Sequence, residues 1–165
     1  MAGMRLRTAL ISLFLTMGAQ PSIAVEGEIP SADNFAETGR LLRQQDIPAI
    51  VFVSRDACPY CRTLRNKILK PMLAADKFEH KAMLIEVSLD RSTPLTDFEN
   101  RQVTAKVFGQ SYNAEITPTL LFLDSDGHEI GKRIIGISNL ELYGHYLHKS
   151  IEEALLTIRT GKQQN

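Results

Sequence analysis

The chain has 165 residues, of which 44% are hydrophobic and 23% are charged, a composition typical of an ordinary globular domain. Lys plus Arg and Asp plus Glu both number 19, so the chain is formally neutral and lacks the basic excess that nucleic-acid binding usually requires. Two cysteines are too few for a disulfide-rich scaffold or a four-cysteine zinc site.

Residues 1–24 are predicted to be a cleaved export signal. Two arginines precede an uncharged, mostly apolar run over residues 8–19, which is shorter than the ~20 residues that span a bilayer. Small residues at the −3 and −1 positions fit cleavage after Ala24. We therefore expect one domain over residues 25–165, beginning with a flexible lead-in over 25–31, in a periplasm-like compartment where disulfides persist. An uncleaved membrane anchor facing the same compartment and a buried N-terminal helix are the alternatives.

The first half of the remaining chain alternates predicted helices with apolar strands. Residues 34–45 have the spacing of a short amphipathic helix, and residues 49–53 (AIVFV) suit a strand that is buried on both faces. A helix is predicted over 59–76, where Pro71 should kink or restart it. Residues 82–89 form a second apolar strand.

The second half begins with a polar, turn-rich segment over residues 90–100. We expect two further helices and two further strands after it: a helix over 104–112, strands over 119–123 and 129–135, and a last helix ending near 157. An Asp-Ser-Asp-Gly turn joins the two strands into a hairpin, and Ser138 or Asn139 can cap the last helix. This order predicts an α/β fold with a mixed sheet and helices on both faces.

Both cysteines lie in one motif, Cys58-Pro59-Tyr60-Cys61, between a strand and a predicted helix. Pro59 suits the first helical position, and the free N–H groups of a helix N-terminus favour a thiolate over a thiol. Three cations nearby in the sequence could add to this effect: Arg55, Arg62 and Arg65. We expect Cys58 to be exposed and reactive and Cys61 to be more buried. Cys58 would then attack a client disulfide, and Cys61 would resolve the mixed disulfide.

Other uses of the cysteine pair fit less well. A structural disulfide around so small a loop would remove little chain entropy. A metal site needs more ligands, and no histidine is closely spaced to the cysteines; His145 and His148 are expected to be solvated on a helix surface. Two inert thiols do not suit an oxidising compartment. The motif therefore favours redox chemistry, and we expect neither a metal nor a cofactor.

The sequence resembles the thioredoxin superfamily over about residues 34–158. The resemblance rests on three separated features: the Cys58–Cys61 motif after AIVFV, Thr117-Pro118 before TLLFLDSDG, and Gly136-Ile137-Ser138 before the last helix. It implies a thioredoxin fold with a central mixed sheet of four or five strands. Within the superfamily, the chain resembles exported, sulfur-oxidation-associated (SoxW-like) thioredoxins, which share the motif, the polar segment with Asp97-Phe98 and the TPTLLFLDSDG stretch.

The resemblance also implies a substrate-binding surface. Pro118 would follow a cis peptide bond and lie beside the cysteines, since cis bonds are essentially confined to proline. The Thr117 backbone would pair with an extended substrate, and Gly136 would leave room for that chain. Pro59 and Tyr60 would complete the surface. The alternatives are a trans Pro118 that starts a strand and a Gly136 that serves a turn.

The chain departs from the superfamily around the second cysteine. Ala57 stands where thioredoxins usually carry Trp, and Phe52 aligns with their buried Asp. Glu86 falls near their buried lysine, and we consider it a replacement proton relay. A carboxylate buried there would have a raised pKa and could take the Cys61 proton. The alternative is that Glu86 faces solvent at a strand edge.

Related enzyme classes fit the chain less well. Cys-Pro-Tyr-Cys is also the glutaredoxin motif, but the double glycine of the glutathione site is missing. Residues 90–116 are too few for the helical domain inserted in DsbA-type oxidases. We therefore predict a monomeric, exported thiol–disulfide oxidoreductase that acts as a reductase on protein disulfides and draws on a membrane electron donor. A disulfide oxidase for folding clients and a non-catalytic peptide-binding module are the alternatives.

Overall fold

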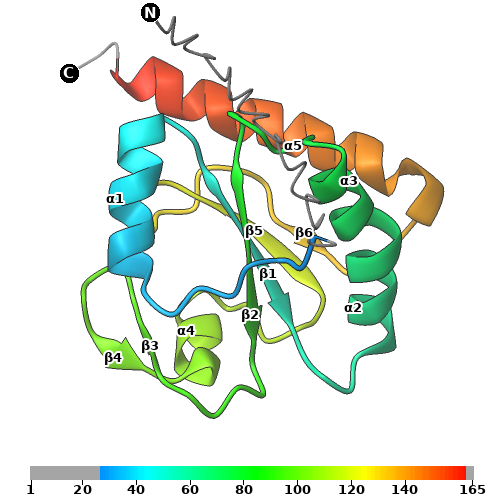
Figure 1. The fold of residues 1–165 in the computed structure, drawn as a ribbon, viewed down its shortest axis with the longest axis horizontal. Coiled ribbons are helices and arrows are strands. Elements are labelled where there is room, and N and C mark those ends of the chain that lie inside the picture. Colours follow the sequence, from blue (N-terminus) through cyan, green and yellow to red (C-terminus); the bar gives the residue numbers. More distant parts are fainter. Residues whose placement is uncertain (1–26, 163–165) are drawn as a thin grey trace, which may run out of the picture.

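The computed structural model describes residues 27–162 (Figure 1). A four-stranded sheet with the order β2-β1-β5-β6 forms its centre. The strands are β1 (Ala49–Ser54), β2 (Met83–Ser88), β5 (Thr119–Leu123) and β6 (Ile134–Ile135). β1 is parallel to β2 and antiparallel to β5, which in turn is antiparallel to β6. The mixed α/β sheet predicted from the sequence is confirmed, with four strands. The expected export signal lies outside the described residues.

Helices cover both faces of this sheet (Figure 1). They are α1 (Phe35–Gln45), α2 (Pro59–Leu64), α3 (Lys70–Ala74), α4 (Ala105–Ser111) and α5 (Leu140–Lys162). The helix predicted over 59–76 is interrupted by a π-helical turn, η1 (Arg65–Leu69), before α3 begins. The interruption therefore starts ahead of Pro71, which lies in the first turn of α3, where its missing N–H is tolerated.

β1 is buried at every position because one layer of helices packs on each of its faces. Ala49, Val51 and Val53 face α1 and α4, in a cluster that includes residues of both helices. Ile50 and Phe52 face the other layer, together with both cysteines, α2 and α5. This two-sided burial explains the uninterrupted apolar run, and it places the cysteines on the α2/α5 side of the sheet.

Pro30 and Ser31, at the end of the expected lead-in, lie along the outer edge of β2. Ser31 bridges Glu86 in parallel, and the Glu86 N–H donates to the carbonyl of Pro30 at 2.8 Å. Ile29 is 9% exposed. The expectation of a flexible lead-in is therefore wrong for this part of it, because the segment supplies the hydrogen bonds that an edge strand would otherwise leave open.

The polar, turn-rich segment predicted over residues 90–100 contains one strand of a small second sheet, and the other strand follows it. β3 (Leu95–Thr96) pairs antiparallel with β4 (Gln102–Val103). Asp97 closes this hairpin, because its carboxylate accepts the N–H groups of Glu99 at 3.0 Å and Arg101 at 2.8 Å. The Asp97 carboxylate thus helps to fix the connection between β3 and β4.

The fourth strand is shorter than the predicted 129–135. Glu129 makes an isolated bridge to Leu123, and the Ile130 N–H donates to the carbonyl of Phe122 at 2.9 Å. A Cβ at Gly131 would lie 3.1 Å from the Phe122 Cβ. Glycine permits this close approach but weakens a strand interior, and regular pairing resumes only at β6.

Candidate redox site

The cysteine pair lies where the chain leaves β1 and enters α2. Cys58 is the N-cap of α2, with an extended backbone, and its Sγ accepts the N–H of Cys61 at 3.1 Å. Pro59 is the first helical residue, as predicted. The two sulfurs form a disulfide with an S–S distance of 2.09 Å. The first turn of α2 therefore brings together the groups that the motif spacing predicted.

The exposure of the two sulfurs differs less than expected. Cys61 is 0% exposed, but Cys58 is only 7% exposed. The expectation of an exposed Cys58 is wrong for this oxidised form, because the capping sulfur turns inward to reach Cys61. Tyr60, at 65% exposure, is the prominent surface residue of the motif.

The second predicted loop lies at the same end of the sheet. The Thr117–Pro118 peptide bond is cis, as the resemblance implies. β5 begins at Thr119, which pairs with Val53 near the end of β1, so Pro118 lies close to the edge from which the chain continues to the cysteines. Pro118 itself is buried, and Thr117 is half-buried.

Gly136 joins this loop through its backbone. Its N–H donates to the carbonyl of Pro118 at 2.8 Å, and its φ of +67° is one that residues with a side chain rarely adopt. A Cβ at Gly136 would meet nothing within 4 Å. Its backbone thus explains the glycine as a turn residue, and its role in accommodating a substrate chain stays a prediction.

Two exposed isoleucines beside these loops were missed from the sequence. Ile116 is 67% exposed and precedes Thr117; Ile135 is 52% exposed and precedes Gly136. The available signal was an apolar residue directly before each predicted substrate-binding position. Because apolar residues next to a strand usually turn inward, that signal could not be separated from ordinary core packing.

Glu86 lies on the cysteine side of the sheet, where it is directly opposite Phe52 in the β1–β2 register. Its Oε1 accepts the Ser54 hydroxyl at 2.5 Å, and its Oε2 accepts the Arg65 Nε–H at 3.0 Å. A second Arg65 N–H donates to Oε1. The Glu86 side chain is only 15% exposed, so it does not point freely into solvent, and the relay role stays a prediction.

Among the three cations near the motif, Arg65 alone lies over the core. Its guanidinium carbon is 5.4 Å from the centroid of the Phe52 ring. The hydrogen bonds to Glu86 raise the pKa of Arg65, although burial partly opposes this. Arg55 pairs instead with Asp90 at 3.2 Å, and Arg62 is exposed.

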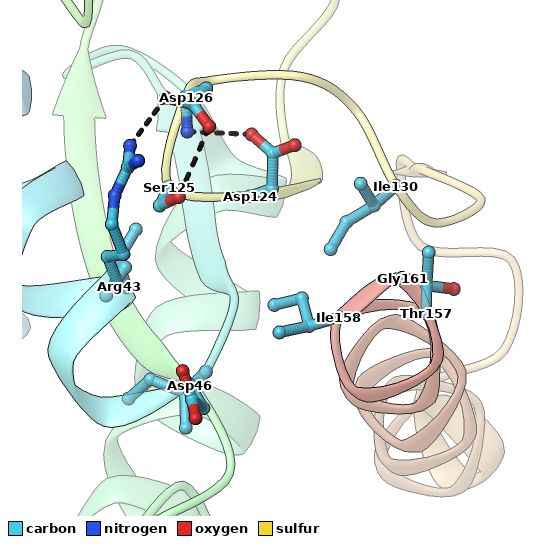
Figure 2. Close-up of a pocket in the computed structure, with 11 residues that line it drawn as sticks. Arg43, Asp46, Asp124, Ser125, Asp126, Ile130, Thr157, Ile158 and Gly161 are labelled. Atoms are coloured by element: carbon cyan, nitrogen blue, oxygen red, sulfur yellow. Dashed lines mark hydrogen bonds and ion pairs between the residues drawn. The ribbon is translucent and has the colours of Figure 1, made fainter. Parts of the chain in front are cut away.

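A separate cavity of about 370 Å³ lies near the C-terminal ends of α1 and α5 (Figure 2). Arg43 reaches Asp126 at 2.6 Å, and Asp124 accepts the Asp126 N–H at 2.8 Å. These aspartates follow Leu123, at the opposite end of β5 from Thr119, so the cavity is remote from the disulfide. Within residues 27–162, no cluster of His, Cys, Asp and Glu could hold a metal, and no helix is long and apolar enough to cross a membrane.

Comparisons with known proteins agree with this arrangement. The model of a thioredoxin-like domain family matches residues 35–151. A solved DsbH oxidoreductase has a TM-score of 0.57 at 17% identity, covering 84% of this chain and 92% of its own. Oxidised mitochondrial thioredoxin 3 from Saccharomyces cerevisiae has a TM-score of 0.50 at 19% identity, covering 76% and 94%. No curated protein matches the sequence. At these identities the solved structures show a shared fold, and a close cysteine pair in that fold suggests thiol–disulfide oxidoreductase activity.

Proposed function

Since the chain belongs to the thioredoxin-like domain family, we propose that it is a thiol–disulfide oxidoreductase whose redox pair is Cys58 and Cys61. The family match confirms the resemblance to the thioredoxin superfamily drawn from the three separated motifs. The observation that carries the proposal is the disulfide at the N-terminus of α2, with Cys58 as the helix cap. This position favours a thiolate, because a backbone N–H already points at the Cys58 sulfur.

In the proposed reductase cycle, the Cys58 thiolate attacks one sulfur of a client disulfide. The client S–S bond breaks, its other sulfur leaves as a thiolate and takes a proton from solvent, and a mixed disulfide forms. Cys61 then loses its proton and attacks the Cys58 sulfur. The second client sulfur leaves, the Cys58–Cys61 disulfide forms, and two electrons have passed to the client.

The client is proposed to lie across the exposed side chains around the disulfide. Tyr60 and Ile116 are 65% and 67% exposed and would offer apolar contacts, with Pro59 beside them. The backbone of Thr117, next to Pro118, would pair with an extended client segment in the manner of an added strand. Gly136 would border that segment, since the space beside its Cα is open.

Location and direction are proposed from the sequence alone. The N-terminal signal pattern supports export to a periplasm-like space, where a reductase needs electrons from a membrane partner. The likeness to sulfur-oxidation-associated thioredoxins suggests protein disulfides, apocytochromes c or sulfur-carrier proteins as clients. The reduction potential distinguishes a reductase, near the ~−270 mV of thioredoxin, from an oxidase near ~−120 mV.

Insulin reduction by dithiothreitol tests the activity. The wild-type protein should accelerate insulin precipitation, and Cys58→Ser should lower the rate to that of dithiothreitol alone. If Cys58→Ser matches the wild type, the exchange mechanism is refuted and the peptide-binding module remains. Cys61→Ala should accumulate mixed disulfides through Cys58, so mass spectrometry of the trapped species in a host extract would identify the clients.

A further inference from the structure

A charged pair lies on the same sheet face as the disulfide, and the proposed cycle does not use it. We propose that Arg65, held by Glu86, is a positioning residue that sets how readily Cys61 loses its proton. The inference rests on the proposed function. It differs from the relay prediction, because here the negative charge of Glu86 partly offsets the positive charge of Arg65, and Glu86 does not accept the proton of Cys61.

The backbone places Arg65 one turn from Cys61. The Arg65 N–H donates to the Cys61 carbonyl, the helical i, i+4 relation that brings two side chains to the same face. Cys61 is 0% exposed and shares a core cluster with Phe52, the ring over which the Arg65 guanidinium lies. The cation therefore belongs to the same buried environment as the resolving sulfur.

Three donors occupy most of the acceptor sites of the Glu86 carboxylate. Two N–H groups of Arg65 bind its two oxygens, and the fully buried Ser54 hydroxyl binds one of them at 2.5 Å. A planar guanidinium fork on a carboxylate is the strongest common form of such a contact. A proton taken from Cys61 would neutralise the carboxylate and weaken its charge-assisted contact with Arg65, so the geometry favours a carboxylate that holds the cation over one that accepts the proton.

The sign of each perturbation follows from the charges. Without the Arg65 charge, Glu86 would be left as an anion near Cys61 and would raise the pKa of its thiol. Without the Glu86 charge, the unbalanced cation would lower that pKa. A relay predicts the opposite result for Glu86, because loss of the base slows proton removal.

Other charged and titratable groups lie on the elements next to the pair and the cysteines, and every variant below retains them. They come from the β1–α2 loop, the segment after β2, α2 and α5: Arg55, Asp56, Asp90, Arg62 and Tyr143. Asp56 also acts on Arg65 electrostatically, and Arg55 is paired with Asp90. Because these groups are constant, differences among the variants report the Arg65–Glu86 pair.

The resolving step can be measured with Ellman's reagent. Attack by reduced Cys58 releases one thionitrobenzoate and leaves a second bound as a mixed disulfide, and attack by Cys61 then releases that second anion. Stopped-flow absorbance across a wide pH range gives the midpoint of the second release. We expect Arg65→Gln to raise this midpoint by about one pH unit, a roughly tenfold slower release below the midpoint. Glu86→Gln should lower it, and the double variant should lie between the single variants.

The pair formed by Glu129 and Arg133 is a matched control. Arg133 also binds both carboxylate oxygens of Glu129, and both side chains are 26% exposed, against 24% and 15% for Arg65 and Glu86. Arg133 additionally donates to the carbonyl of Tyr112, which packs on the opposite layer of the sheet. Glu129→Gln and Arg133→Gln should leave the midpoint unchanged.

The outcomes separate this inference from the proposed function. If the wild-type protein releases no second anion, the proposed exchange cycle fails. If it does, but Glu86→Gln raises the midpoint or leaves it unchanged, the inference is overturned, and a raised midpoint indicates a relay. Arg65→Lys retains the charge without the planar fork and should hold the midpoint close to the wild-type value; a shift as large as that of Arg65→Gln would also overturn the inference. Thermal unfolding of each variant verifies that the folded protein is being compared.

Discussion

Replacing Tyr143 by Phe should stabilise the protein. Within residues 27–162, the Tyr143 hydroxyl is the one buried side-chain polar atom that has no hydrogen-bond partner. The residue is 2% exposed, and burial raises the pKa of its hydroxyl. A buried, unsatisfied polar group costs about 1–3 kcal/mol. Because Phe retains the ring and removes only the oxygen, Tyr143→Phe should increase the free energy of unfolding by about that amount.

Tyr112 is the matched control for this prediction. Its hydroxyl donates to the carbonyl of Gly127 at 2.9 Å, and burial raises its pKa to about 12. Tyr112→Phe removes a satisfied hydrogen bond and leaves a carbonyl unpaired, so it should lower the free energy of unfolding by about 0.5–1.5 kcal/mol. The same chemical change should therefore have opposite effects on stability at the two tyrosines.

Urea unfolding of the oxidised protein measures both changes. A shift of the midpoint at constant slope reports stability, because the slope follows the surface exposed on unfolding. For a domain of this size, 1 kcal/mol corresponds to about 2–4 °C in melting temperature. If Tyr143→Phe lowers the midpoint as Tyr112→Phe does, the Tyr143 hydroxyl is hydrogen-bonded in solution and the reasoning is refuted.

Three further substitutions test other parts of the structure. Asn34→Ala removes the side chain that accepts the Glu37 N–H at 3.0 Å, so it should lower the free energy of unfolding in urea by about 1 kcal/mol. A decrease of less than a few tenths of a kcal/mol would exclude a capping role. Burial opposes ionisation of Asp97, but hydrogen bonds from the Arg101 backbone and side chain and from Glu99 outweigh it, so its pKa is lowered. The stability from Asp97 is then present above its unfolded pKa of ~3.9 and lost as the pH falls through the folded pKa. Urea midpoints should accordingly fall less on acidification for Asp97→Asn than for the wild type; an equal fall would count against this linkage. Gly136→Ala should lower the free energy of unfolding by about 1 kcal/mol, because alanine is strained at the positive φ of this position. The same substitution should slow the reduction of insulin more than the reaction with Ellman's reagent. Equal slowing with both substrates would argue against a client chain beside Gly136.

The elements that the sequence predicted best carry their own local signals. Asn34 and Thr104 cap α1 and α4 through their side chains, and Pro59 opens α2. β1 and β5 are uninterrupted apolar runs buried on both faces. The β3–β4 hairpin had no such signal, because its strands are two residues long and depend on tertiary contacts. One of these contacts is the bridge between Thr96 and the cap residue of α1.

The candidate site also contains features that the sequence predicted and features that it did not. The cysteine motif was identified because its chemistry is read directly from neighbouring residues, and Pro118 was identified through the resemblance to the thioredoxin superfamily. The low exposure of Cys58 was missed, since it depends on how the capping sulfur turns to meet Cys61. The contact between Arg65 and Glu86 was missed because 21 positions separate them, and the strand register that places Glu86 opposite Phe52 is not visible in the sequence. The spacing of four residues between Cys61 and Arg65 was the available clue.

Stability and reactivity should respond differently to changes in the Arg65–Glu86 pair, and this difference separates a functional pair from a structural one. Losing either partner leaves a partly buried charge uncompensated, so Arg65→Gln and Glu86→Gln should both lower stability. Because the side chains are 24% and 15% exposed, we expect about 1–3 kcal/mol, less than the ~3–5 kcal/mol of a fully buried pair. If the pair had only a structural role, both variants would lose stability and the Cys61 midpoint would not shift in opposite directions. Opposite shifts in the Cys61 midpoint cannot arise from destabilisation, since both variants are destabilised. They would have to come from the charge that each variant leaves on the cysteine side of the sheet.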